Sequence, residues 1–450
     1  MTQFRRGKRE LFGYIIGAEA GGLKSDLSEM QGSEDMEPVA LGTAPEVAAS
    51  PADRPFLFIH IRKTAGVSLR GLLANRFPAD RILFQAHSVS GPQQPGDFSF
   101  ATGHIDFDYA QRFDVWPTTF TMLREPILRS ISVFDFYQSH TEPYFRTLST
   151  ELSETDYQSR RRFDDRARSL GLQRFLIEEE TLARQSLANV QTRHLAGACC
   201  AGLVDDDPRL IETALRHLAR IDLAGIVERM QDTLLLLGQM THWGKIGPLQ
   251  HLNRTPGSNS SAVDPDCLDI LRSWNQFDLR LYEEACRLLD SKLRALDNLR
   301  SDDALPDAAW PIDGDVYLPD QPIHGFGWYE REHHQGRWLC WNSSPTATLN
   351  FRPSKARPLQ IRCLLSHVIN EAALRHLAMT LNSVPLALRM REAEGGILLE
   401  SDIPASAWTA EPDAARLTFT CPVMSRPCDI DPNSTDVRNL GIALAWLRFD

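Results

Sequence analysis

One lysine stands in a short, hydroxyl-rich turn directly after an apolar segment. The segment 56–61 is Phe-Leu-Phe-Ile-His-Ile, and it is followed by Arg62, Lys63, Thr64, Ala65, Gly66, Val67 and Ser68. Backbone amides of such a turn, with those that begin the next helix, converge on one point and bind an anion, while the lysine supplies the counter-charge. The sequence therefore predicts a phosphate-binding loop. It differs from the ATP-type loop, which ends in Gly-Lys-Ser/Thr, because Lys63 precedes the glycine.

A second basic group follows the apolar segment 118–123. Arg124 comes directly after it, Pro126 begins a segment with helical spacing, and Ser132 lies on that expected helix. Arginine suits phosphate because its planar guanidinium makes paired, charge-assisted hydrogen bonds. An ATPase would be expected to place an acidic magnesium ligand at the end of such a strand. Alone the pattern fits an ordinary strand, turn and proline-started helix, but with the Lys63 turn it indicates a second phosphate contact.

A lone histidine stands between these two groups. His104 follows Thr102 and Gly103 at the end of a third expected strand, 98–102. An imidazole titrates near neutrality, so it can accept a proton during catalysis or serve a structural role. We treat His104 as a candidate base.

The elements that must position these residues alternate between strand and helix from residue 55 to about residue 299. This alternation predicts an α/β domain, a parallel sheet flanked by helices. Strands are expected at 56–61, 82–84, 98–102, 118–123 and 221–227, and helices after 68 and 126 and at 172–180, 208–219, 232–243 and about 277–299.

The remaining regions have different compositions. Residues 1–54 are rich in Ala, Gly, Glu, Ser and Pro, and they are expected to form a flexible leader. Residues 300–314 are expected to be a linker. Residues 315–450 contain short apolar segments separated by Pro, Gly, Asn and Asp, which predicts an all-β domain, a sandwich or jelly roll. A chain of 450 residues is longer than one hydrophobic core usually supports, so two domains are expected.

Charge and composition exclude several classes of protein. A net charge of −11 disfavours a nucleic-acid-binding protein. No segment has the run of about eighteen apolar residues that a membrane-spanning helix needs. The eight cysteines show no Cys-x-x-Cys spacing, so neither a zinc site nor a disulfide framework is expected. We expect no metal site, free thiols and a cytoplasmic location.

The order Lys63-Thr64-Ala65-Gly66-x-Ser68 resembles the 5′-phosphosulfate loop of sulfotransferases, in particular the family that includes heparan sulfate 2-O-sulfotransferase and its bacterial relatives. These enzymes use 3′-phosphoadenosine 5′-phosphosulfate (PAPS) as sulfuryl donor. The segment 124–132 resembles the family's 3′-phosphate element, and Gly103-His104 resembles its His-Gly-His segment, with Thr102 in place of the first histidine. Two weaker matches, 189–195 and 253–255, complete a resemblance that covers about 55–299.

The resemblance implies a P-loop-like domain that transfers a sulfuryl group from PAPS to a hydroxyl of a carbohydrate, such as a polysaccharide. His104 would be the base, and Lys63 would stabilise the leaving nucleotide without a metal. Arg124 and Ser132 would hold the 3′-phosphate. Residues implied at the 5′-phosphosulfate are Arg62, Lys63, Thr64, Ala65, Gly66, Val67 and Ser68, with Arg254 reaching the nucleotide from a loop.

Two alternatives remain open. One is a P-loop phosphotransferase that uses ATP or GTP. The other is a catalytically inactive, sulfotransferase-like protein that binds glycans, and Thr102 in the first histidine position keeps that alternative open. The segment 325–330 with Trp338 and Trp341 resembles β-sandwich modules of bacterial glycan-modifying enzymes, although aromatic residues in such domains more often belong to the core.

Overall fold

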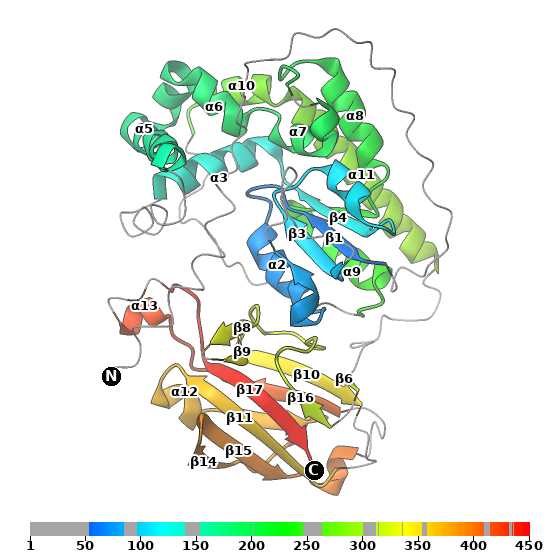
Figure 1. The fold of residues 1–450 in the computed structure, drawn as a ribbon, viewed down its shortest axis with the longest axis vertical. Helices are drawn as coiled ribbons and strands as arrows, with labels where there is room; N and C mark the ends of the chain where they lie inside the picture. Colours follow the sequence, from blue (N-terminus) through cyan, green and yellow to red (C-terminus); the bar gives the residue numbers. More distant parts are fainter. Residues whose placement is uncertain are drawn as a thin grey trace.

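A computed structural model describes residues 54–84, 97–139, 154–200, 202–244, 246, 263–299, 312–313, 315–334, 336–352, 358–408, 415–431, 434 and 436–450. Residues 1–53 of the expected leader, most of the expected linker and Arg254 lie outside the described residues. Figure 1 shows an α/β region and, beside it, an all-β region. This arrangement confirms the predicted order of an α/β domain and then a β-domain.

The α/β domain is built on a parallel five-stranded sheet with the order β2-β3-β1-β4-β5. The strands are β1 (Phe56–Ile59), β2 (Ile82–Leu83), β3 (Phe100–Gly103), β4 (Thr118–Leu123) and β5 (Leu223–Ile226). β1 is central, and Ile59 pairs with both Gly103 and Thr121. The residues that follow β1, β3 and β4 therefore meet at one edge of the sheet, where ligands of such folds usually bind.

Helices cover both faces of this sheet, and its central strands β1, β3 and β4 are accordingly buried along their whole length, including the threonines of β3 and β4. They are α2 (Gly66–Ala74), α3 (Pro126–Ser139), α5 (Glu154–Glu178), α6 (Glu180–Leu187), α7 (Val190–Ala196), α8 (Pro208–Leu218), α9 (Met230–Met240), α10 (Pro265–Trp274) and α11 (Gln276–Leu299). The helix expected at 172–180 is divided between α5 and α6, and α5 itself is kinked at Gly171, whose φ is 69°. No helix of the described residues is long and apolar enough to span a membrane.

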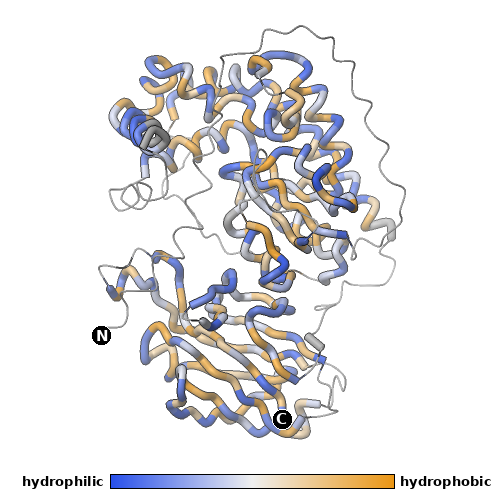
Figure 2. Tube along the Cα trace, viewed as in Figure 1, coloured by the Kyte–Doolittle hydropathy of each residue, from blue (hydrophilic) through white to orange (hydrophobic). Residues whose placement is uncertain are grey.

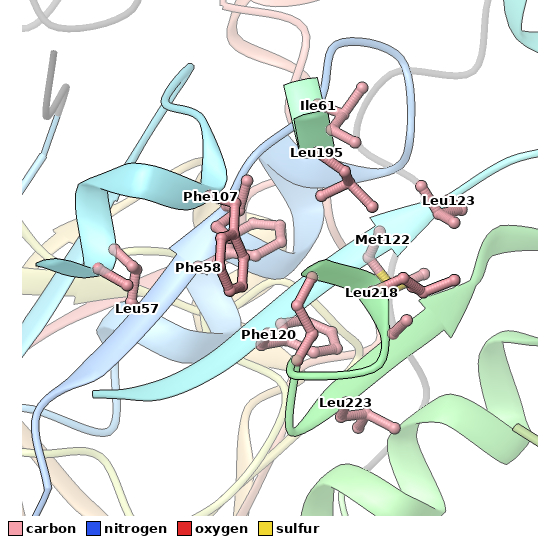
Figure 3. Close-up of a cluster of buried hydrophobic side chains, with 14 of the residues drawn as sticks. Leu57, Phe58, Ile61, Phe107, Phe120, Met122, Leu123, Leu195, Leu218 and Leu223 are labelled. Atoms are coloured by element: carbon pink, nitrogen blue, oxygen red, sulfur yellow. The ribbon is translucent and has the colours of Figure 1, made fainter. Parts of the chain in front are cut away.

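In the core of the α/β domain, the middle strands pack against helices that come much later in the sequence. Figure 3 shows side chains of β1, β4 and β5 packed with Leu195 of α7 and Leu218 of α8. The rings of Phe58 and Phe120 stack with centroids 5.2 Å apart across β1 and β4. This close packing makes the edge that follows β1 and β4 a rigid platform.

The β-domain contains two sheets whose inner faces share one core. One has the order β13-β12-β16-β10-β6, and the other has the order β14-β15-β11-β17-β9-β8, with β7 also paired to β17. Strand bounds are β6 (Ile312–Asp313), β7 (Val316–Tyr317), β8 (Glu332–His334), β9 (Arg337–Trp341), β10 (Thr346–Arg352), β11 (Gln360–Val368), β12 (Ala378–Leu381), β13 (Val384–Pro385), β14 (Arg389–Ala393), β15 (Gly396–Asp402), β16 (Ala415–Thr420) and β17 (Ile442–Phe449). Two short helices are α12 (Glu371–Arg375) and α13 (Pro427–Ile430).

One detail of this domain differs from the sequence-based expectation. β6 lies within the expected linker and pairs with β10 in parallel, whereas the other strand pairs described in this domain are antiparallel. Figure 2 shows that apolar residues are frequent along the strands of both domains. Because the two sheets bury these side chains against each other, the domain has the architecture of a sandwich.

The aromatic residues considered as sugar contacts divide into two groups. Trp328 is 8 % exposed, and its Nε1 donates to the Thr348 carbonyl at 2.8 Å, while its ring meets that of Phe419. Tyr329 is also buried, whereas Trp338 and Trp341 are partly exposed. Trp328 and Tyr329 therefore belong to the interior.

Replacement of Trp328 by phenylalanine tests this assignment. We expect Trp328→Phe to lower the free energy of unfolding of the β-domain by about 1–3 kcal/mol, because it leaves a small cavity and an unpaired buried carbonyl. The partly exposed Trp341 provides the control, with Trp341→Phe expected to change stability by less than about 0.5 kcal/mol. Denaturant unfolding followed by tryptophan fluorescence measures both, and equal effects would contradict the interior role of Trp328.

Candidate functional site

The turn between β1 and α2 has an unusual backbone. Lys63 and Ala65 have φ angles of 66° and 63°, in the left-handed region that residues other than glycine seldom occupy. Each such residue costs about 1–2 kcal/mol and is found most often at functional sites. Ala65 is also the N-cap of α2, and no side-chain hydrogen bond caps the helix there. The first amides of α2 are therefore suited to bind an anion.

Three further residues of the predicted loop have defined places in the turn or in the helix that follows it. The buried Thr64 hydroxyl donates to the Ile61 carbonyl at 2.8 Å, which ties the turn back to the end of the strand. Ser68 lies within the first turn of α2 because the helix begins at Gly66. Val67 lies beside it in that first turn.

Gly66 is required by a neighbour that sequence analysis did not identify. A Cβ atom at residue 66 would lie 1.7 Å from Nε2 of His60. The His60 ring therefore packs directly against the start of α2, and only glycine allows this approach. His60 is the first residue after β1, so its place beside the loop follows from the sheet.

His104 is held by the backbone of His60. The Nδ1 atom of His104 lies 2.9 Å from the His60 carbonyl oxygen, and the two rings are 4.6 Å apart. A carbonyl only accepts hydrogen bonds, so Nδ1 must carry the proton. In the neutral imidazole the basic nitrogen is then Nε2, which is the tautomer that a general base requires.

Two further histidines surround His104. Burial lowers the pKa of His60 well below its usual value, and the neighbouring His104 lowers it further. Burial lowers the pKa of His194, on α7, to about 3, again with contributions from His104 and from Arg62. Both rings are therefore neutral at pH 7. Thr102 is buried in β3, and the ring that lies beside His104 is that of His60.

Arg124 joins the end of β4 to the loop after β1. Its Nη1 donates to the Lys63 carbonyl at 3.2 Å. Its backbone is fixed by Gln191, whose side-chain oxygen accepts from the Arg124 amide and whose Nε2 donates to the Arg124 carbonyl, each at 2.9 Å. Glu228 Oε1 lies 4.0 Å from its Nε. The two predicted phosphate-binding elements are thus in direct contact.

The face of α3 that is turned toward this contact carries Ser132, Asp135 and Phe136. Ser132 is buried, and the ammonium nitrogen of Lys63 lies 4.3 Å from the centroid of the Phe136 ring. Burial raises the pKa of Asp135, while Lys63 and Arg124 lower it. Sequence analysis missed Asp135 and Phe136, although their spacing of three and four residues from Ser132 places all three on one helical face.

The segment 189–195 has a mainly structural role. The Asn189 side chain accepts from the amides of Phe277 and Asp278, and the Asp278 carboxylate accepts from the amides of Gln191 and Thr192. These bonds join α7 to α11. Arg193 pairs with Asp205 at 3.3 Å. Within this segment, Gln191 connects to the site through Arg124, and His194 through its position near His104.

The combined arrangement can bind anions and accept a proton. Positive charge comes from Lys63 and Arg124, helix amides converge beside them, and His104 presents a basic nitrogen on the neighbouring strand end. Among the described residues, no group of three or more His, Cys, Asp or Glu side chains is arranged to hold a metal ion.

The low pKa of His194 predicts a pH effect on stability. Below pH 6.5 the unfolded state binds more protons at this residue than the folded state, so stability falls as pH decreases from about 6.5 toward the folded pKa. We expect the free energy of unfolding of His194→Gln to fall less than that of the wild type between about pH 7.5 and pH 5. Denaturant titrations at each pH measure this, and parallel curves would show that His194 protonates as readily when folded.

Comparisons with known proteins were made for the whole chain. No protein-family model matches it, and no curated protein matches it significantly.

Proposed function

We propose that the chain is a PAPS-dependent sulfotransferase that acts on a hydroxyl group of a carbohydrate. The observation that carries the proposal is the hydrogen bond from Arg124 to the Lys63 carbonyl. It joins two cationic elements from different strand ends, which suits a ligand with phosphates at two separate positions, such as adenosine 3′,5′-bisphosphate. The motif resemblance supports the sulfuryl donor and the carbohydrate acceptor.

The proposed reaction is an in-line transfer. His104 Nε2 takes the proton of the acceptor hydroxyl as its oxygen forms a bond to sulfur. The bond between sulfur and the bridging phosphate oxygen breaks, and adenosine 3′,5′-bisphosphate leaves. The Lys63 ammonium and the amides of the loop stabilise the negative charge that develops on this oxygen. The proton stays on His104 until solvent removes it. The proposed step involves no metal ion.

The neutral histidines support the assignment of His104. His60 and His194 are held neutral by burial, so neither opposes the appearance of positive charge on His104 during proton transfer. The bond from Nδ1 to the His60 carbonyl remains in place when the ring is protonated, and it then becomes charge-assisted. These contacts suit a residue that gains and loses a proton in each cycle.

We also propose a cytoplasmic location, which the eight free cysteines support.

Substitution of Lys63 and His104 tests the catalytic roles. We expect His104→Asn to lower kcat by about 10²–10⁴-fold, because asparagine can keep the bond to the His60 carbonyl but cannot accept the proton. Lys63→Met should lower kcat by about 10²–10³-fold through loss of charge at the leaving oxygen. The control is Arg389→Met, which removes an exposed ion pair with Asp402 in the β-domain. Sulfate transfer from labelled PAPS measures all three, and wild-type activity in His104→Asn would exclude His104 as the base.

A binding comparison tests the role of Arg124. We expect Arg124→Met to weaken binding of adenosine 3′,5′-bisphosphate by about 10–100-fold, because a charge-assisted contact to the 3′-phosphate is lost. Adenosine 5′-phosphosulfate lacks that phosphate, so its affinity should change much less. Ser132→Ala, which removes one hydroxyl from the same proposed contact, should show the same selectivity with a smaller loss. Equal losses for both ligands would mean that Arg124 does not contact the 3′-phosphate.

Calorimetry of the wild type separates this function from the alternatives. Binding of adenosine 3′,5′-bisphosphate without magnesium supports the sulfotransferase. Magnesium-dependent binding of ATP would instead favour a phosphotransferase, in which Asp135, whose carboxylate interacts with both Lys63 and Arg124, is a candidate acidic group for the metal. Binding of neither nucleotide would favour a protein without turnover.

A further inference from the structure

The helix that begins at the candidate site ends against the β-domain. α2 starts at Gly66 in the phosphate-binding turn and finishes at Ala74, and Figure 1 shows it directed toward β8 and β9. The part of the β-domain that it meets is the segment 320–331, which we call the docking segment. This segment precedes β8 and contacts the last residues of α2 and the turn that follows.

Arg331 binds the carbonyl end of α2. It is 7 % exposed, and its Nη2 donates to the carbonyls of Ala74, at 2.7 Å, and Phe77. Its Nη1 donates to the carbonyls of Asp320 and Gln321 within the docking segment. The last carbonyls of a helix lack partners within the helix and carry partial negative charge, so a buried guanidinium there satisfies both needs.

Contacts also run in the opposite direction. Arg76 donates to the carbonyls of Ile323 and Gly325 at 3.1 and 3.2 Å, and Asn75 Nδ2 donates to the Tyr329 carbonyl at 2.9 Å. Two backbone bonds cross the same boundary, from the Ile323 amide to the Asn75 carbonyl and from the Ala79 amide to the Asp320 carbonyl. Backbone bonds across a domain boundary fix both position and orientation, so the end of α2 is held from both sides.

One face of α2 continues this contact toward the site. Arg70 donates to Glu330 through Nε and Nη2 at 3.2 and 3.1 Å, and a Cβ at Gly71 would lie 3.4 Å from the Glu330 Cβ. Arg70 stands only four residues after Gly66. The docking segment therefore follows α2 for more than half of its length.

The short length of α2 makes this contact relevant to the phosphate-binding turn. Nine helical residues span about 13 Å and form a stiff rod, so its far end cannot move without moving the first amides. We propose that Arg331 is a positioning residue for the phosphate cradle: from the β-domain it fixes α2, and through α2 it fixes the amides that bind the anion. The nature of that anion rests on the proposed function, whereas the positioning does not.

The first test needs no nucleotide. In the full-length chain, Arg331→Met should speed amide exchange at Leu69, whose N–H makes the first hydrogen bond of α2 to the Ala65 carbonyl, by about tenfold or more. Amides in the centre of β4 should keep their wild-type rates. Arg389→Met, on the far side of the β-domain, is the matched control and should change neither. Exchange at Leu69 that rises no more than exchange in β4 would overturn the proposal.

The second test measures binding and turnover. We expect Arg331→Met to weaken adenosine 3′,5′-bisphosphate binding by about three- to tenfold. Arg331→Lys keeps the charge but makes fewer hydrogen bonds, so its affinity should lie between those of Arg331→Met and the wild type. KM for PAPS should rise more than kcat falls, because the cradle is displaced while His104 is not. Unchanged affinity in Arg331→Met would overturn the proposal.

A second variant and the exchange measurement distinguish a folding failure from a failure of the positioning role or of the proposed function. If Arg331→Met does not fold, Glu330→Gln, which weakens only the contact with Arg70, takes its place in both measurements with a smaller expected change. If the wild type does not bind adenosine 3′,5′-bisphosphate, the proposed function fails, and the exchange rate at Leu69 still decides whether Arg331 positions α2.

Discussion

The hydrogen bond from the Arg124 guanidinium to the Lys63 carbonyl is the contact on which the rest of the candidate site depends. The backbone of Lys63 is in the left-handed region, and its carbonyl faces Arg124 at the end of β4. The contact stabilises a backbone conformation that costs energy and brings a second cation beside the anion cradle. Without it the loop and the arginine would be two separate surface features.

The fold supports this contact in a simple way. β1 lies between β3 and β4, so the residues after these three strands must share one edge of the sheet. Gln191 then holds the backbone of Arg124 at two points, and Asp278 holds Gln191. A chain of buried polar contacts thus extends from α11 to the Lys63 turn. Such a chain is rigid because each buried group would lose its partner if it moved.

Much of the scaffold could be predicted from the sequence, because strands covered on both faces form short runs of apolar and β-branched residues that stand out from helices. The strand expected at 118–123 is β4 as found, and that expected at 56–61 differs from β1 only at its end. Lys63, His104 and Arg124 could be predicted to meet because parallel strands share an edge. His60, His194 and Arg331 could not, because their roles depend on which rings and helix ends lie beside them in space. For Trp328 the sequence favours the interior position that it has, because aromatic residues of short-stranded domains more often belong to the core, but it does not show which side chains surround it.

The distribution of charge divides the site into two parts with different tasks. Lys63 and Arg124 lie together on the side of α3, where Asp135 offsets part of their charge. On the side of β3 three imidazoles gather, and burial keeps His60 and His194 neutral. If these two rings were charged, they would disfavour protonation of His104 and compete with the cations for the anion. Because they are neutral, the positive charge of the described site lies with Lys63 and Arg124, on the other side from the three rings. The close approach of His60 to Gly66 maintains this division, since it places one neutral ring between His104 and the start of α2.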